Sequence, residues 1–265
     1  MLVTRERQIL CGKDYKEVDI IKAFTNKKLN GRGKKKELSS PKQKNLNDKR
    51  AWRYLCQLIN ANFTDMRDYL LHLTFKEEEL PSSVEEGEAL VKNYMRRLNY
   101  RLRKAGKENC KYIIIPSVTS SKTGEIVRLH FHIILSCDLE RAEILGQWEY
   151  GRKNLNELQG EEDKYQKLCE YLKKNFKSGR RWISSLNLKK PEEKMPNDMK
   201  YTARQIERIA KAPVDIDFWE RKYPGWTLIS CDDAYQVEYN ELTGWNIYLK
   251  LRRKNEKGRR ERRKC

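Results

Sequence analysis

Two histidines separated by one residue lie inside an apolar run of the chain, Leu129-His130-Phe131-His132-Ile133-Ile134-Leu135. Side chains at positions i and i+2 of a β-strand point to the same face, so a strand here places both imidazoles together. Neutral imidazoles bind divalent metals, and coordination completed by carboxylate, water and phosphate oxygen favours Mg²⁺ or Mn²⁺ over zinc. The pair therefore predicts a metal site; two core histidines satisfied by hydrogen bonds are the alternative.

A tyrosine with basic neighbours provides a nucleophile for the same chemistry. The pattern predicts a helix over Glu161 to Lys177, whose apolar stripe consists of Tyr165, Leu168, Cys169, Leu172 and Phe176. Tyr171 lies away from this stripe, with Lys167 and Lys174 on its flank. A phenolate attacks a phosphodiester when a metal and lysines neutralise the developing charge, leaving a phosphotyrosyl adduct and a free 3′ hydroxyl. A solvated surface tyrosine is the alternative.

The charge distribution indicates a polyanionic partner. The chain of 265 residues has a formal net charge of +19, and most of this excess lies in two segments, residues 22–50 and 250–265. Basic segments of this kind bind phosphate backbones, and Lys34, Lys35 and Lys36 are candidate DNA contacts. The alternative is that both segments only keep the chain soluble.

Several classes of protein are excluded by the remaining patterns. Apolar runs fall short of a membrane span, and the first residues lack a secretory signal, so we expect a cytoplasmic protein without a membrane partner. Seven scattered cysteines without a C-x-x-C pair predict neither a disulfide framework nor a zinc finger. Phosphate-binding glycine loops are absent, so we expect no NTP-binding module within the chain.

The elements alternate irregularly, which predicts an α+β fold with an antiparallel sheet. We expect helices over residues 48–62, from 81–83 to 106, 139–148, 161–177 and 200–211. We expect strands over residues 69–75, 112–118, 126–135, 181–184, 226–230, 235–239 and 245–251, with a hairpin loop at 119–124.

Three motifs in this order resemble the HUH endonuclease superfamily, specifically the rolling-circle replication initiators of phages and plasmids related to the gene II protein of filamentous phages. They are Leu71-His72-Leu73-Thr74-Phe75, Leu129-His130-Phe131-His132 and Glu170-Tyr171-Leu172-Lys173-Lys174. Flanking segments at residues 60–63 and 181–191 extend the resemblance, which covers about residues 45–191 and weakens towards 253.

The resemblance implies a central antiparallel sheet flanked by helices and a site-specific endonuclease and ligase that nicks single-stranded or hairpin origin DNA in a bacterial host. It implies His130 and His132 as metal ligands, Tyr171 as nucleophile and Lys174 as its charge-stabilising or proton-handling partner. Asn175 stands where some relatives carry a second tyrosine, so a single-tyrosine cycle is implied. No carboxylate stands at Pro116 or Ser117, where a third ligand is expected; Glu125 or water remains open.

The expected organisation is a basic N-terminal segment (1–44), the endonuclease core (45–191), a C-terminal helix with antiparallel strands (192–251) and a basic tail (252–265). Host helicase and polymerase are the expected protein partners. A transposase or relaxase with the same chemistry, and a non-catalytic single-stranded nucleic-acid-binding protein, are the alternatives. Further candidate DNA contacts are Lys167, Lys173, Lys177, Arg181, Trp182, Lys189 and Lys190.

Overall fold

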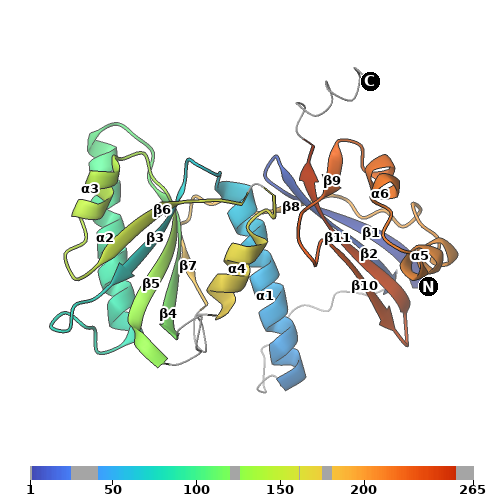
Figure 1. Ribbon diagram of the computed structural model, residues 1–265, viewed down its shortest axis with the longest axis horizontal. Coiled ribbons are helices and arrows are strands. Elements are labelled where there is room, and N and C mark those ends of the chain that lie inside the picture. The colour runs from blue at the N-terminus through green and yellow to red at the C-terminus, as the bar shows by residue number, and fades with distance from the viewer. Residues whose placement is uncertain (1, 25–40, 120–125, 161, 175–180, 255–265) are drawn as a thin grey trace. The chain divides into compact units, whose positions relative to one another are not determined.

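The computed structural model describes residues 2–24, 41–119, 126–160, 162–174 and 181–254, without the side chains of 41–46, 119, 126 and 127. The chain forms two compact units (Figure 1). One contains residues 1–61, 162–164 and 190–265, and the other contains residues 62–161 and 165–189. Both contain antiparallel sheets with helices, which confirms the α+β prediction. None of the described helices is long and apolar enough to cross a membrane.

The second unit, here called the nuclease-like unit, is built on a five-stranded sheet in the order β6-β3-β5-β4-β7. Its described elements are β3 (Tyr69–Thr74), α2 (Val84–Lys104), β4 (Lys111–Thr119), β5 (Ile126–Ser136), α3 (Arg141–Gly146), β6 (Lys153–Glu157), α4 (Gln166–Lys174) and β7 (Ile183–Ser184). All paired strands in this sheet are antiparallel. The central pairing of β4 with β5 follows the two predicted apolar strands.

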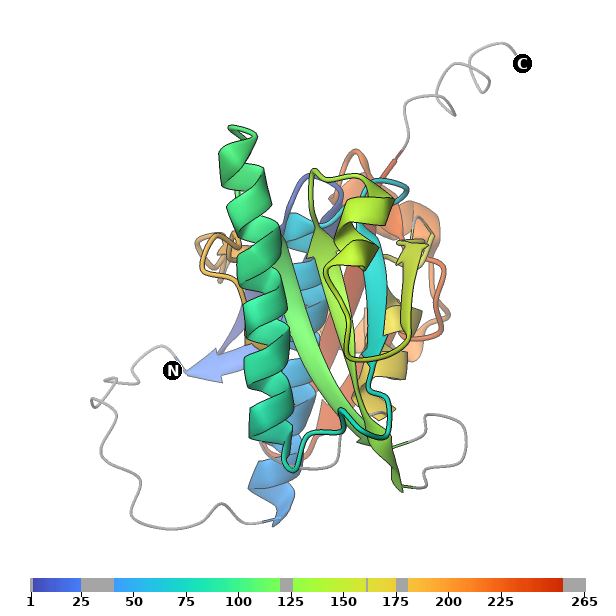
Figure 2. The ribbon, with the colours of Figure 1, turned by 90° about the vertical axis from the view of Figure 1, so that its left-hand side faces the viewer.

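Helices cover both faces of this sheet (Figures 1 and 2). Alternate residues of β3 and β5, including Leu71, Phe131 and Ile133, enter a core with Val91 and Leu98 of α2. The Ser83 side chain accepts a hydrogen bond from the Glu86 amide and so fixes the beginning of α2. Helix α4 lies across the opposite face, so the sheet separates the large core from the face that carries the histidines.

The first unit contains a six-stranded sheet in the order β10-β11-β2-β1-β8, with β9 also pairing with β11. Its elements are β1 (Leu2–Cys11), β2 (Tyr15–Phe24), α1 (Pro41–Asn62), β8 (Glu192–Glu193), α5 (Ala203–Lys211), α6 (Ile216–Lys222), β9 (Trp226–Leu228), β10 (Tyr235–Asn240) and β11 (Gly244–Arg253). Ile206 of α5 and Trp219 of α6 pack against Val18 and Ile20 of β2 on one face.

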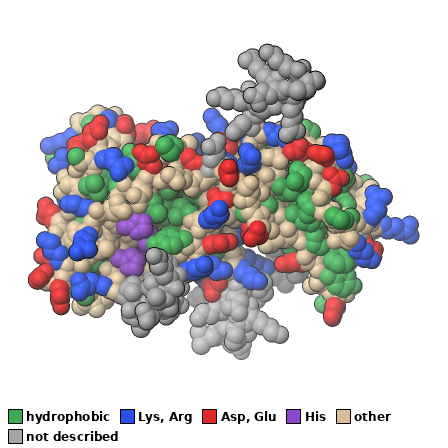
Figure 3. All heavy atoms as spheres, in the orientation of Figure 1, with side chains coloured by type: hydrophobic (Ala, Val, Ile, Leu, Met, Phe, Trp, Pro, Cys, Tyr) green, Lys and Arg blue, Asp and Glu red, His purple; other side chains and the backbone are tan. Residues whose placement is uncertain are grey.

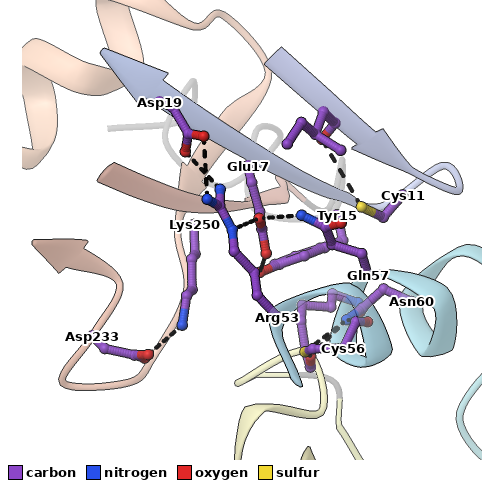
Figure 4. Close-up of polar contacts among 12 residues, drawn as sticks. Cys11, Tyr15, Glu17, Asp19, Arg53, Cys56, Gln57, Asn60, Asp233 and Lys250 are labelled. Atoms are coloured by element: carbon purple, nitrogen blue, oxygen red, sulfur yellow. Dashed lines mark hydrogen bonds and ion pairs between the residues drawn. The ribbon is translucent and has the colours of Figure 1, made fainter. Parts of the chain in front are cut away.

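A polar network fixes α1 to the other face of this sheet (Figure 4). Arg53 of α1 donates hydrogen bonds of 2.6 Å to Glu17 and to Asp19 of β2, and Gln57 donates a 2.6 Å bond to Glu17. The two carboxylates are almost completely buried, and Arg53 provides their charge compensation. This ion pair therefore links α1 to the sheet.

The element predictions are correct over most of the described chain, with three kinds of difference. Strands β1 and β2 occupy residues for which only a basic segment was expected, and β6 and α6 were not expected. Helix α1 begins at Pro41, earlier than the expected residue 48.

The prediction that the tyrosine helix begins at Glu161 is wrong, because α4 begins at Gln166. Lys164 and Tyr165 precede it with φ of 49° and 63°, in the left-handed region that a continuing right-handed helix excludes. The Lys164 carbonyl accepts a 2.8 Å hydrogen bond from Asn60, which holds the chain in this conformation. The expected end of the helix at Lys177 and most of the expected hairpin loop lie outside the described residues.

Candidate active site

Strands β3 and β5 bring all three histidines of the chain to one face of the sheet. In the antiparallel register His72 lies opposite His132, and Thr74 lies opposite His130. Paired residues share a face, as do residues two apart on one strand. The ring centroids are 4.6 Å apart for His72 and His132 and 5.0 Å apart for His130 and His132. The predicted histidine pair is therefore part of a cluster of three imidazoles.

The alternation of β5 determines this orientation. Leu129, Phe131, Ile133 and Leu135 all enter the core beneath α2. Because burial of these four side chains fixes the register, the intervening histidines must face the other side. In the orientation of Figure 3, histidine side chains reach the surface beside basic side chains.

His132 is buried in an unusual way for a polar residue. Its side chain is 1% exposed, and neither Nδ1 nor Nε2 has a hydrogen-bond partner. Burial, reinforced by the neighbouring His72 and His130, lowers the pKa of His132 to about 2, so its imidazole is neutral at physiological pH. Burial also lowers the pKa of His72, with a smaller contribution from His130. A neutral imidazole with unpaired nitrogens is a suitable ligand for a metal ion.

His130 is oriented by the backbone of its own strand. Its Nδ1 lies 3.0 Å from the carbonyl oxygen of Arg128. When Nδ1 donates to this carbonyl, Nε2 carries the lone pair, which is the arrangement that prepares a histidine for metal binding. Among the described residues, no group of three or more His, Cys, Asp or Glu side chains is arranged to hold a metal ion. The donor types fit a divalent cation, whereas ligation requires the rings to turn towards a common point.

The nucleophile candidate lies next to this cluster. Tyr171 is on α4, half-buried, and its ring centroid is 5.2 Å from that of His132. Cys169 and Leu172 are the buried residues on either side of it, so the apolar stripe of the helix faces the sheet and Tyr171 lies at its margin. Lys174 is exposed and lies one turn after Tyr171, while the exposed Lys167 lies one turn before it. The structure thus brings the predicted tyrosine and histidines together.

The other predicted DNA contacts are dispersed. Lys34, Lys35, Lys36 and Lys177 lie outside the described residues. Lys173 is exposed on α4, Arg181 and Trp182 are half-buried just before β7, and Lys189 and Lys190 are exposed. The backbone at Lys189 exchanges two hydrogen bonds with the Asn62 side chain, of 2.8 and 2.7 Å, and this fixes the position of that loop.

Two features of the site were not assigned from the sequence. His72 was quoted only as part of a strand motif, although it is the imidazole opposite His132. A pocket of about 480 Å³ lies beside His130, and its lining includes the cations Lys76, Arg128 and Arg152. The signal for His72 was its alternation with Leu71 and Leu73, which places it on the face away from the core.

Comparison with protein families gives one match. Residues 68–176 match the family model described as replication-associated protein ORF2/gene 2 protein. The matched range runs from β3 to α4 and so includes the three histidines and Tyr171. No curated protein and no solved structure gives a significant match. The match covers less than half of the chain and supports a Rep-like protein with a role in the initiation of replication.

Proposed function

We propose that this protein is a metal-dependent, single-strand DNA endonuclease and ligase of the HUH type, which nicks a replication origin through a covalent phosphotyrosine. The observation that carries the proposal is the contact between Tyr171 and His132 within the three-imidazole cluster. The family match favours replication over transposition or conjugation as the process that uses this chemistry.

In the proposed reaction the Tyr171 oxygen attacks a backbone phosphorus. Its phenolic proton passes to water, a Tyr–O–P bond forms, the bond from phosphorus to the 3′ oxygen breaks, and that oxygen takes up a proton. Lys174 contributes positive charge near the phenol as negative charge develops. Rejoining is the reverse displacement by a 3′ hydroxyl on the phosphotyrosine.

We assign His72, His130 and His132 as the cation ligands, with His72 completing the set that the sequence left open. A divalent cation held there supplies neutralisation of the phosphate charge. An all-imidazole set favours Mn²⁺ over Mg²⁺, because Mg²⁺ prefers oxygen ligands. The two unpaired nitrogens of His132 are the observation that supports this assignment.

The test is formation of a covalent adduct with DNA. Wild-type protein is incubated with a library of labelled single-stranded oligonucleotides and Mn²⁺, and protein–DNA species are mapped after denaturation. We expect Tyr171→Phe to form no adduct while retaining DNA binding. Tyr100→Phe is the matched control, since this exposed tyrosine lies on α2, which packs on the opposite face of the sheet.

Unchanged cleavage by Tyr171→Phe would remove Tyr171 as the nucleophile. Nicking that survives EDTA would remove the metal from the proposal. DNA binding with no cleavage by the wild type under any divalent cation would favour the non-catalytic nucleic-acid-binding alternative.

A further inference from the structure

The pocket beside His130 is a cationic site at one end of the histidine face. Lys76, Arg128 and Arg152 are exposed side chains of its lining, and Thr74 and His130 also border it. Arg128 lies 3.9 Å from Glu77, but both side chains are largely exposed, so this pair is weak and leaves the arginine available. Three cations around one pocket favour an anionic ligand.

The backbone around this pocket is rigidly connected. The Thr74 and Lys76 amides donate hydrogen bonds of 2.9 and 2.7 Å to the carbonyls of Arg152 and Tyr150. The Arg152 amide donates a 3.0 Å bond to the Thr74 hydroxyl. The segment that carries Arg152 thus continues the ladder between β3 and β6, and its position is set before any ligand arrives.

A buried aromatic cluster supports this segment from below. Trp148 is fully buried, donates a 3.0 Å hydrogen bond from Nε1 to the Thr74 carbonyl and packs edge-on against Phe75 and Tyr94. Gly151 packs so closely that a Cβ there would lie 2.3 Å from the Thr74 carbonyl oxygen. Such support is characteristic of a preorganised binding site.

The position of the pocket along β5 relates it to the reaction. Tyr171 contacts His132, whereas the pocket is lined by Arg128, Leu129 and His130, further back along the same strand. In an in-line displacement the leaving oxygen departs on the side opposite the attacking oxygen. The strand end that carries the leaving 3′ hydroxyl therefore runs away from Tyr171 and towards the pocket.

We propose that this pocket binds the 3′-hydroxyl end of the cleaved strand, with Arg128, Arg152 and Lys76 on the phosphodiester one nucleotide 5′ of the break. The ligand class is a single-stranded DNA end with a free 3′ hydroxyl. Arginine suits this role because its guanidinium forms paired hydrogen bonds with phosphate oxygens. The site retains that end, or receives a new one, for rejoining. This inference rests on the proposed nicking reaction.

The test is the joining half-reaction. Adduct carrying a 5′-phosphotyrosyl fragment is isolated and supplied with acceptor oligonucleotides that end in a 3′ hydroxyl. For Arg152→Ala and for Arg128→Ala we expect the acceptor KM to rise about tenfold or more, with little change in kcat, because a charge-assisted phosphate contact is lost. Arg103→Ala on α2, which removes the same charge beyond the other face of the sheet, should leave KM unchanged.

A neutral methylphosphonate at the last linkage of the acceptor identifies the contacted phosphate. It should raise the wild-type KM by a similar factor and have little further effect in Arg152→Ala. Equal effects in both proteins, or a KM for Arg152→Ala like that of Arg103→Ala, would overturn the assignment. If the wild type forms no adduct, the proposed function fails; equilibrium binding of the two acceptors to wild type and Arg152→Ala then tests the pocket alone, and equal affinities there would overturn it.

Discussion

Replacement of His132 by leucine should stabilise the metal-free protein while abolishing activity. His132 is 1% exposed, and both of its ring nitrogens lack partners. A buried polar group without a hydrogen bond costs about 1–3 kcal/mol of folding free energy. Leucine has a similar volume and has no polar atom to desolvate. The free energy of unfolding in EDTA should therefore rise by about 1–3 kcal/mol in His132→Leu.

His130→Leu is the matched control. His130 is only half-buried, and its Nδ1 contacts the Arg128 carbonyl, so its removal relieves no comparable cost. Urea denaturation in EDTA measures both variants. For a chain of this size each kcal/mol corresponds to a rise of roughly 2–4 °C in the melting temperature.

Addition of Mn²⁺ should reverse the order of stability. A ligand at one hundred times its dissociation constant stabilises the native state by about 2.7 kcal/mol. Wild-type protein should gain this stabilisation, and His132→Leu should gain little because it lacks the buried ligand. The reasoning would be refuted if His132→Leu in EDTA were less stable than His130→Leu, since the unpaired nitrogens would then carry no cost.

Three further predictions concern pH, the pocket segment and the first unit. In EDTA, His132 has a native pKa of about 2 and an unfolded value near 6.5, so the unfolded chain binds the extra proton; stability should fall as pH drops below about 6.5, less steeply in His132→Leu, as urea midpoints at several pH values will show. Gly151→Ala should destabilise by about 1–3 kcal/mol, because the new Cβ meets backbone of β3, whereas Gly146→Ala has open space and should be neutral by thermal unfolding. Arg53→Ala should cost about 3–5 kcal/mol by leaving two buried carboxylates of β2 uncompensated, and the exposed Arg50→Ala should cost little in the same denaturation experiment.

Local signals in the sequence were sufficient for the elements whose burial is simple. Helix α2 combines a serine cap with an apolar stripe, and β4 and β5 are apolar runs separated by turn-forming residues. Strand β6 has one buried residue, Leu155, among exposed polar ones, so its sequence contains no alternation that indicates a strand. It forms because it pairs with β3, and that pairing is a tertiary interaction.

Strands β1 and β2 were missed for a related reason. Their sequences are rich in charge, and β2 buries Lys16, Glu17 and Asp19. Charged residues usually indicate an exposed segment, but here Arg53 on α1 compensates the two acids. Because that partner lies more than thirty residues away, composition alone assigned these residues to a basic segment.

The candidate site divides along the same line between local and tertiary information. Strand periodicity alone places His130 beside His132, and helix periodicity alone separates Tyr171 from its apolar stripe. The addition of His72 depends on β3 pairing with β5 across a register that α2 and β4 interrupt in sequence. A third ligand was therefore sought on the neighbouring β4 positions Pro116 and Ser117, whereas the other neighbour of β5 supplies an imidazole. A central strand has two partners, so a search for ligands beside a histidine pair must consider both, and only the sheet order decides between them.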